Sequence, residues 1–185
     1  MTDLNEKRLA LIPVLAESSK SRQIGRTALM KYFYFLQTLR NVPLGYRFTL
    51  YSYGPFDSDV LSDLSDAESL GVVESEPVLY SGGYGYQIRS STKSNWIKKK
   101  VSPFLKEHRP DIKWVSKTFG SLKSAELELV STIIYVDREA AQKKEKVSLV
   151  ELSNRVHEVK PHFNQNRIQI FAQDLASRKL LQAAK

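Results

Sequence analysis

The chain has 185 residues, of which 42% are hydrophobic and 10% aromatic, a composition typical of a globular protein. It contains no cysteine, which excludes disulfides and thiolate metal sites, and no apolar run reaches the length of a membrane span. The first residues, MTDLNEKRLA, lack the apolar core of a signal peptide, so we expect a cytoplasmic protein without membrane contact. The net charge of +8 indicates affinity for polyanions.

A first helix is expected around Leu9, Ile12 and Leu15, which recur at helical spacing. Pro13 falls inside this pattern and removes a backbone hydrogen bond, so it predicts a kink or a division into two pieces. Residues 18–23 are polar and predict a loop.

A second helix is expected over residues 25–40. Leu29, Phe33 and Leu36 follow the helical period, and further aromatic residues make this helix apolar on more than one side. Such a helix should lie at the centre of the core.

Residues 48–89 read as a strand, a helix and a hairpin in turn. Gly54-Pro55 predicts a turn after the strand, and Asp57 can cap a helix that Gly71 closes in the left-handed conformation. Gly82-Gly83, between two apolar runs, predicts a tight two-residue hairpin turn. A helix followed directly by a hairpin is the second half of a winged helix, so we expect a winged-helix-like unit with a β-hairpin wing.

A lysine-rich helical stretch begins near Thr92, in which Trp96, Ile97 and Phe104 are expected to face inward. The segment from Arg109 to Gly120 contains Pro110 and is the best candidate boundary between two domains.

Three further helices are expected in the C-terminal part. A first helix begins at Ser124, and residues 137–146 are expected to be a charged, solvated loop. Ser148 and Asn164 fit helix caps, and Pro161 ends the helix between them. The last two helices are joined by a short turn and resemble a helix-turn-helix. We therefore expect an α+β, mainly α fold with a winged-helix-like domain over residues 1–108, a linker over 109–123 and a helical domain over 124–185.

The chain resembles the uncharacterised bacterial YwgA-type proteins in five blocks: RTALMKYFYFLQ, FTLYSYGPFDSDVLSDLSDAESLGVV, ELELVSTIIYV, VHEVKPHF and RIQIFAQDLASRKLL. More distantly it is similar to SocA-like or Panacea proteins, which combine a Lys-, Leu- and Tyr-rich helix with a Tyr-Gly-Pro turn. The resemblance implies a winged-helix-like fold in bacterial proteins associated with toxin–antitoxin or anti-phage operons, without an active site to carry over. Panacea-type proteins usually end near the first domain, whereas this chain continues into a second helical unit.

The helix that precedes the wing is acidic. Residues 57–76 contain seven carboxylates and no Lys or Arg. In a winged helix this element enters the DNA major groove, where these carboxylates would repel the phosphates. We predict that it does not read DNA and is either a solvated surface or a docking face for a basic protein partner, made of Asp57, Asp59, Asp63, Asp66 and Glu68.

The segment that follows is basic. Residues 89–123 contain ten Lys and Arg against two carboxylates, and the aromatic residues among them could stack on bases or belong to the core. Amide residues near the start of the last helix could read base edges. The candidate nucleic-acid-binding residues are Lys98, Lys99, Lys100, Lys113, Lys117, Lys123 and Arg167.

Evidence for an enzyme is thin. Arg155 and His162 have the Arg-x6-His spacing of HEPN-type ribonucleases, but Pro161 directly precedes the histidine and a second copy is missing, which indicates a chance match. Three histidines in all leave little for a metal site, and we expect no metal, cofactor or small-molecule substrate.

The leading hypothesis is therefore a non-catalytic, cytoplasmic adaptor or regulatory subunit in a bacterial anti-phage defence or toxin–antitoxin complex. The alternative is a nucleic-acid-binding regulator that uses the basic residues 93–123 and the last helix. A minor alternative is a ribonuclease centred on Arg155 and His162.

Overall fold

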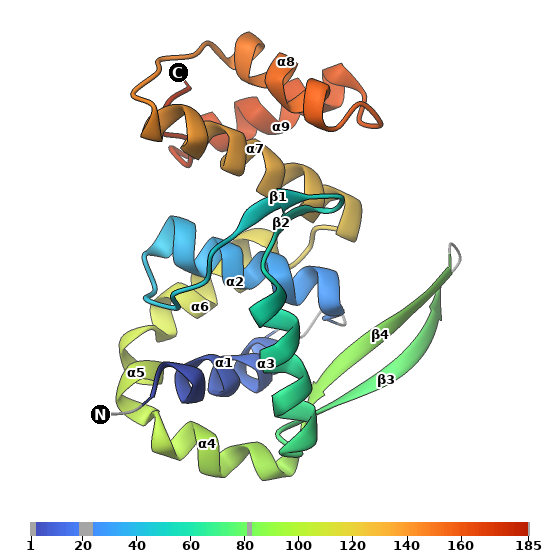
Figure 1. The fold of residues 1–185 in the computed structure, drawn as a ribbon, viewed down its shortest axis with the longest axis vertical. Coiled ribbons are helices and arrows are strands. Elements are labelled where there is room, and N and C mark those ends of the chain that lie inside the picture. The colour runs from blue at the N-terminus through green and yellow to red at the C-terminus, as the bar shows by residue number, and fades with distance from the viewer. Residues whose placement is uncertain (1–2, 19–23, 81–82, 185) are drawn as a thin grey trace. The chain divides into compact units, whose positions relative to one another are not determined.

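The computed structural model describes residues 3–18, 24–80 and 83–184. Within them the chain is mainly helical and carries two short β-hairpins, so the predicted α+β, mainly α class is confirmed (Figure 1). The chain divides into two compact units. The first consists of residues 1–49 and 56–122, and the second of residues 50–55 and 123–185.

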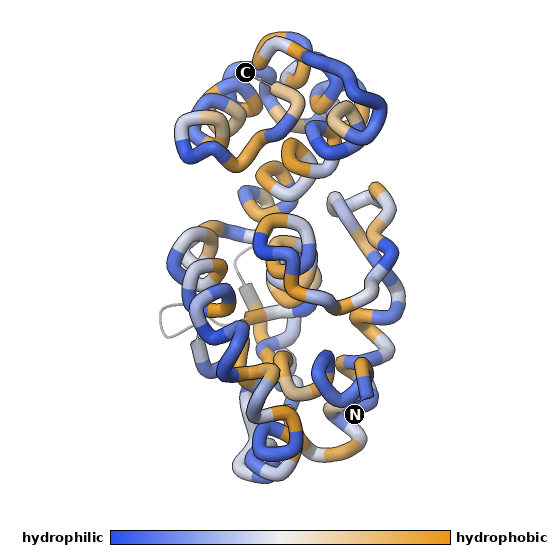
Figure 2. The backbone as a smooth tube through the Cα atoms, turned by 90° about the vertical axis from the view of Figure 1, so that its left-hand side faces the viewer, coloured by the Kyte–Doolittle hydropathy of each residue, from blue (hydrophilic) through white to orange (hydrophobic). Residues whose placement is uncertain are grey.

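The first unit is built around helix α2 (Arg26–Arg40). All eight residues of α2 from Leu29 to Leu36 are buried, which confirms the predicted central core helix. Helices α1 (Leu4–Ser18), α3 (Ser58–Ser69) and α6 (Arg109–Phe119) contact α2. Figure 2 shows hydrophobic and hydrophilic residues alternating along the helices, as expected where each helix buries one side.

Helix α1 runs through Pro13 without dividing into two pieces, in contrast to one of the two expected outcomes. Pro13 is buried, and Leu9, Ile12 and Leu15 around it are buried as predicted. Packing of this apolar side compensates for the hydrogen bond that proline removes. Of the loop predicted over residues 18–23, Ser18 belongs to α1 and residues 19–23 lie outside the described residues.

The predicted turn at Gly54-Pro55 is wrong. Strand β1 (Thr49–Tyr51) pairs with strand β2 (Gly54–Phe56), so the turn lies at residues 52–53. Gly54 adopts a left-handed φ of 83°, and a Cβ at this position would come within 3.0 Å of the hydroxyl of Ser131 on the long helix of the second unit. The glycine therefore allows a close backbone approach inside the strand instead of forming the turn.

The second hairpin joins β3 (Val73–Tyr80) to β4 (Gly83–Ser90), as predicted. Its register differs by one residue from the expected one, because Gly83 pairs with Tyr80 and belongs to β4. Residues 81–82 lie outside the described residues. Gly71, with φ at 65°, closes α3 as predicted.

Residues 109–119 form helix α6 where a linker was expected. Pro110 stands in the first turn and Gly120 follows the last residue, so both mark the ends of a helix. Phe119 is buried and its ring stacks on that of Phe35 on α2 at 4.0 Å between centroids. This helix belongs to the first unit, which extends to Leu122.

A short 3-10 turn (Thr92–Ser94), α4 (Asn95–Lys100) and α5 (Ser102–Glu107) connect the hairpin to α6. Ile97 and Phe104 are buried, as predicted. Trp96 was expected to face inward, but its side chain is 46% exposed. The neighbouring position Ile97 fills the core contact of this short helix, which leaves Trp96 on the outside.

The second unit packs α8 (Leu149–Val159) and α9 (Gln165–Ser177) against each other and against α7 (Ser124–Gln142). Ser148 and Asn164 cap α8 and α9, as predicted. Of the solvated loop expected over residues 137–146, only residues 143–146 lie outside a helix and are mostly exposed; α7 continues to Gln142, and Asp137 is fully buried.

No helix in the described part of the chain combines the length and the apolar character needed to cross a membrane.

Candidate functional site

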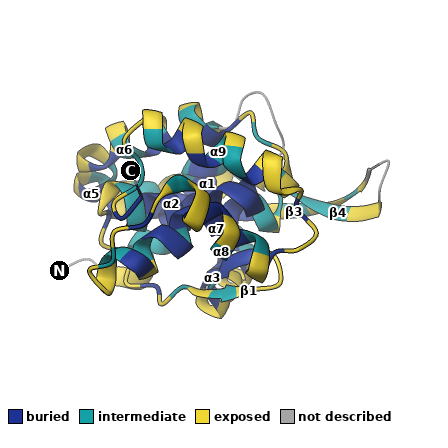
Figure 3. Ribbon diagram, turned by 90° about the horizontal axis from the view of Figure 1, so that it is seen from above, coloured by how far each residue is buried: buried dark blue, intermediate teal, exposed yellow. Residues whose placement is uncertain are grey.

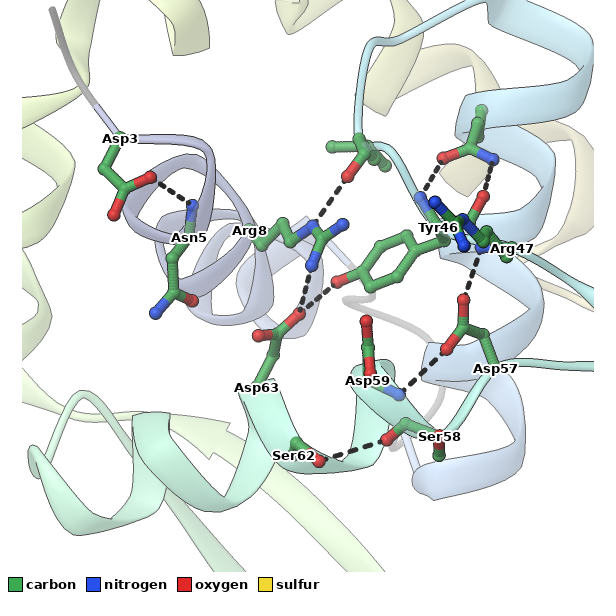
Figure 4. A network of polar contacts seen from close by, with 12 residues as sticks. Asp3, Asn5, Arg8, Tyr46, Arg47, Asp57, Ser58, Asp59, Ser62 and Asp63 are labelled. Carbon is green, nitrogen blue, oxygen red and sulfur yellow. Dashed lines mark hydrogen bonds and ion pairs between the residues drawn. The ribbon is translucent and has the colours of Figure 1, made fainter.

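The acidic helix α3 begins with a buried side-chain cap. Asp57 is the N-cap residue, and its Oδ1 accepts a hydrogen bond of 2.9 Å from the backbone N–H of Asp59. Its Oδ2 accepts a second hydrogen bond, from the backbone N–H of Arg47 (Figure 4). Because Asp57 is buried, this predicted docking residue fixes the start of the helix instead.

Asp63 is the second acidic residue that the fold uses internally. Its Oδ2 accepts a hydrogen bond of 2.6 Å from the phenol of Tyr46 and lies 3.8 Å from the guanidinium of Arg8 (Figure 4). Arg8 also lies over the ring of Tyr46, 4.1 Å from its centroid, and donates a hydrogen bond to the carbonyl oxygen of Leu44. Burial raises the pKa of Asp63, while the Tyr46 hydrogen bond and the Arg8 charge partly oppose this shift.

Stability should therefore depend on pH through Asp63. Because its pKa is raised in the folded state, its contribution is fully present below the ordinary value of 3.8 and is lost as the pH rises through the folded value. We expect Asp63→Asn to flatten the fall in stability with rising pH above 3.8, measured as urea midpoints across this range. Asp174→Asn on α9 is the control, and an unchanged slope in Asp63→Asn would contradict the assignment.

The remaining acidic residues of α3 are differently placed. Asp59 and Asp66 are exposed, and their spacing of seven residues puts them on one side of the helix, two turns apart. Glu68 is half-buried, and its carboxylate accepts a hydrogen bond from the hydroxyl of Ser75 on β3. The predicted docking face is thus reduced to two exposed carboxylates, with Glu68 at the foot of the β3–β4 hairpin.

Two of the predicted nucleic-acid-binding lysines form ion pairs with α1. The Nζ of Lys98 lies 2.7 Å from Oε1 of Glu17, and Lys100 pairs with Glu6. Lys99, between them in the sequence, is exposed. Lys98 and Lys100 therefore pair α4 with α1, although Lys100, like Lys99, is exposed.

The other predicted basic residues are exposed and lie on several elements. Lys113 and Lys117 are four residues apart on one side of α6. Lys123 is the N-cap of α7, and Arg167 on α9 lies 3.5 Å from the carboxylate of Glu126. Since Lys123 and Arg167 belong to the second unit, the predicted set is divided between the two units.

The second unit holds a buried charged cluster that sequence reasoning missed. Lys160, the C-cap of α8, is 4% exposed and donates hydrogen bonds to the carbonyl oxygens of Tyr51, at 2.9 Å, and of Ser52. Oε1 of Glu128 on α7 lies 3.2 Å from this ammonium and 3.3 Å from Nε2 of His162. This oxygen has no aligned hydrogen bond within the described residues, so the ammonium of Lys160 stabilises it. The cluster ties residues 51–52 to α7 and α8.

The two residues of the Arg-x6-His pattern have separate partners. The guanidinium of Arg155 binds the carboxylates of Glu145 and Glu151, and His162 lies against Glu128. An arginine that holds two carboxylates is poorly placed to polarise a phosphate. The geometry therefore gives the ribonuclease reading no support.

The described residues do not form a set of ligands for a metal ion. In the ranges 3–18, 24–80 and 83–184, no three His, Asp or Glu side chains come together in a way that could hold a metal ion. The buried carboxylates of Asp57, Asp63 and Asp137 instead accept hydrogen bonds from protein groups. Their arrangement serves the fold and leaves the exposed surfaces as the candidates for function.

Asp137 is the buried carboxylate that sequence reasoning placed in a solvated loop. Oδ1 accepts hydrogen bonds from the backbone N–H groups of Ala183, at 3.0 Å, and Ala184, at 2.9 Å, and Oδ2 accepts one of 2.7 Å from that of Gln182. A signal for its burial exists in the sequence, because Asp137 follows Ile133 by four residues and continues the apolar side of α7.

Comparison with known proteins gives one relationship. No family model matches the chain. Over 142 residues the chain is 32% identical to the uncharacterised protein YwgA of Bacillus subtilis, and the aligned region covers 74% of this chain and 79% of YwgA. This extent includes parts of both compact units. The YwgA-type relationship predicted from the sequence is thereby confirmed, and the chain belongs to the YwgA family.

Proposed function

We propose that this protein is a non-catalytic adaptor or regulatory subunit that acts through contacts with another protein. The observation that carries the proposal is that Asp59 and Asp66, on either side of the buried Asp63 along α3, are exposed, and that Leu70, after the helix, is 49% exposed. Residues 57–76 contain no Lys or Arg, and the cations that the structure places near α3 are Arg8, beside Asp63, and Lys93, beside Gly71. A partner with a basic, partly apolar surface would complement this side of the helix.

We further infer that the first unit is winged-helix-like, with α3 before the wing formed by β3 and β4. In a DNA-binding winged helix the element at this position enters the major groove. Asp59 and Asp66 would face phosphates there and oppose binding. The sign of the charge therefore favours a protein partner over DNA at this helix.

The biological setting rests on the resemblance to SocA-like or Panacea proteins and to YwgA-type proteins. That resemblance supports a role inside a bacterial anti-phage defence or toxin–antitoxin complex. Within such a complex the protein would hold or regulate a partner that performs the chemistry.

Reversing the charge of α3 should release the partner. We expect Asp59→Lys combined with Asp66→Lys to lower the amount of partner recovered with the protein from its native host by roughly tenfold or more, since like charges across an interface cost several kcal/mol. Both side chains are exposed, so the fold should be retained, which circular dichroism would check.

The matched control is Glu158→Lys combined with Asp174→Lys, which makes the same change in net charge on the second unit. This control should recover as much partner as the unmodified protein. Equal losses in both double variants would show a general effect of charge and would contradict docking at α3.

One observation favours a second candidate function, a nucleic-acid-binding regulator. Trp96 is 46% exposed on α4 and stands three residues before the exposed Lys99, so an aromatic face and a positive charge lie on the same side of the helix. Salt-dependent binding of duplex or single strands that Trp96→Ala and Lys99→Glu both abolish would select this function. Binding that ignores both substitutions would remove it.

A further inference from the structure

The exposed side of helix α6 carries charge of one sign. The exposed residues of α6 are Arg109, Pro110, Lys113 and Lys117. The three cations follow one another at intervals of four residues, so they lie on one side of the helix, about 6 Å apart along its axis. In Figure 3 the exposed segments of α5 and α6 are drawn in yellow. We call Arg109, Lys113 and Lys117 the basic face.

The charge of the basic face is not neutralised within the described part of the chain. In the ranges 3–18, 24–80 and 83–184, its three side chains form no ion pair and no hydrogen bond. The one acidic residue of α6 is Asp111, which has partners of its own. Its carboxylate lies 2.8 Å from Nε of Arg40 and 3.1 Å from Nδ1 of His108. The basic face is therefore left to solvent with its full positive charge.

The neighbouring helices do not supply a compensating negative charge. Helices α1, α2 and α5 pack on α6, and α2 contains no Asp or Glu. The two carboxylates of α1 are held in ion pairs by lysines of α4. On α5, Glu107 is exposed, and the exposed Lys106 directly before it balances its charge. This leaves the three charges of the basic face in excess.

The composition of the basic face distinguishes between classes of anionic partner. The core of a protein interface is apolar and depleted in lysine, and a helix that lies on a membrane buries an apolar side among the lipids. The apolar residues of α6, Ile112, Val115 and Phe119, are buried inside the fold, and Pro110 is the one uncharged residue on its exposed side. Phosphates of nucleic acids are bound by Lys and Arg without an apolar core. The basic face therefore favours a nucleic-acid backbone.

The aromatic residues of α6 favour a duplex over a single strand. Proteins bind single strands by stacking bases on exposed aromatic rings. The ring of Trp114 is half-buried, contacts Phe119 edge to face, and has the guanidinium of Arg40 over it at 5.1 Å from its centroid. Duplex DNA carries a phosphate charge for about every 1.7 Å of its axis, and the basic face extends over about 12 Å, so each of the three cations can reach a phosphate.

We propose that the basic face of α6 binds the phosphate backbone of a nucleic-acid duplex. Contacts with phosphates alone carry no sequence information, so this binding is independent of sequence. The proposal goes beyond the adaptor function, which concerns α3, and it does not involve Trp96 on α4. Each of the three assignments can fail without the others.

The salt dependence of duplex binding tests the proposal. The probe is a short fluorescent DNA duplex of random sequence, and its anisotropy is measured with the full chain from about 50 to about 200 mM salt. Three phosphate contacts contribute about −2.7 to the slope of log affinity against log salt. The neutralised variant combines Arg109→Gln, Lys113→Gln and Lys117→Gln. We expect it to make this slope shallower by about 2 to 3 and to weaken binding at about 50 mM salt at least tenfold.

Two control variants separate the basic face from net charge and from helix structure. The charge-conserving variant exchanges Arg and Lys at the same three positions and should keep the affinity within about twofold, because phosphate binding depends mainly on charge. The net-charge control replaces three exposed lysines of the second unit by glutamine and should retain the slope: Lys143, Lys146 and Lys179. All replaced side chains are exposed, so the fold should be retained, which circular dichroism would check.

Several results would overturn the proposal. Absence of duplex binding at about 50 mM salt, an unchanged slope in the neutralised variant, or an equal change in the net-charge control would show that α6 does not hold phosphates. Tighter binding of a single strand of the same length would exclude the duplex. Loss of duplex binding in Trp96→Ala but not in the neutralised variant would assign the binding to α4.

Other anionic probes give the remaining outcomes. Vesicles of phosphatidylcholine and phosphatidylserine in equal parts, or polyglutamate, that bind through the basic face more tightly than the duplex would assign it to a membrane or to an acidic protein and would overturn the proposal. Failure at α6 leaves the adaptor function standing, because that function is tested by the charge reversal on α3.

Discussion

Asp137→Ala is expected to destabilise the second unit by about 3–5 kcal/mol, the range for removing one partner of a buried ion pair. Asp137 is fully buried, and its carboxylate lies 2.6 Å from the guanidinium of Arg138. It also accepts hydrogen bonds from the backbone N–H groups of residues 182–184. Alanine would leave these donors without an acceptor and would release residues 182–184 from α7.

The measurement is urea unfolding together with hydrogen exchange at the amides of residues 182–184. The control is Asp174→Ala, because Asp174 forms an exposed pair with Arg178 one helical turn away. We expect the control to change the free energy of unfolding by no more than about 0.5 kcal/mol. Slow exchange at 182–184 in Asp137→Ala would contradict the structural role of this carboxylate.

Lys160→Met is expected to destabilise the same unit by about 3–5 kcal/mol. The substitution keeps much of the side-chain volume but removes the ammonium that donates to the carbonyl oxygens of Tyr51 and Ser52. It also leaves the buried carboxylate of Glu128 without the closer of its two basic neighbours. Unfolding in urea would measure the change, and Lys143→Met, at an exposed position, is the control.

The interaction between Lys160 and Glu128 can be tested by a double-mutant cycle. Since Glu128→Leu removes the carboxylate that Lys160→Met leaves unpaired, the double variant should be less destabilised than the sum of the single variants, by about 1–3 kcal/mol. Nε2 of His162 is 3.3 Å from the same carboxylate. Lys160→Met should therefore lower the free energy of unfolding further when His162 is also replaced by alanine. Strict additivity of the two substitutions would show that Lys160 and Glu128 do not interact.

Local patterns in the sequence predicted much of the fold. The apolar period of residues 29–36 identified the central helix, and Asp57, Ser148 and Asn164 act as the helix caps that their positions indicated. These features depend on neighbours within one turn of the chain, so the sequence alone contains the relevant interactions. The β3–β4 hairpin was found for the same reason.

Long-range contacts explain the failures. Asp137 was predicted to be a loop residue because the backbone N–H groups that it binds lie 45 to 47 residues further along the chain. Lys160 reads as a surface lysine, yet its partners lie more than 100 residues away at Tyr51 and Ser52. Asp63 was assigned to an exposed face because its contact with Tyr46 crosses from another segment.

The acidic docking face was predicted from the charges of residues 57–68, and the burial of two of these residues in the structure corrected the prediction. Sequence composition identified the acidic helix, whereas the structure assigns Asp57 and Asp63 to the fold and leaves Asp59 and Asp66 at the surface. Exposure of the wing could not be read from the sequence, because Val73 and Leu79 are equally apolar and differ only in what packs on them. Both α3 and the β3–β4 hairpin were predicted as elements, and the structure adds which of their side chains are exposed.

Native mass spectrometry of the protein purified from its own host tests the adaptor function most directly. We predict a species heavier than the 21.1 kDa chain that contains a second, different polypeptide, and that is lost when Asp59 and Asp66 are both replaced by lysine. Detection of the 21.1 kDa chain alone, of its multiples, or of the chain bound to nucleic acid without another protein would contradict this function.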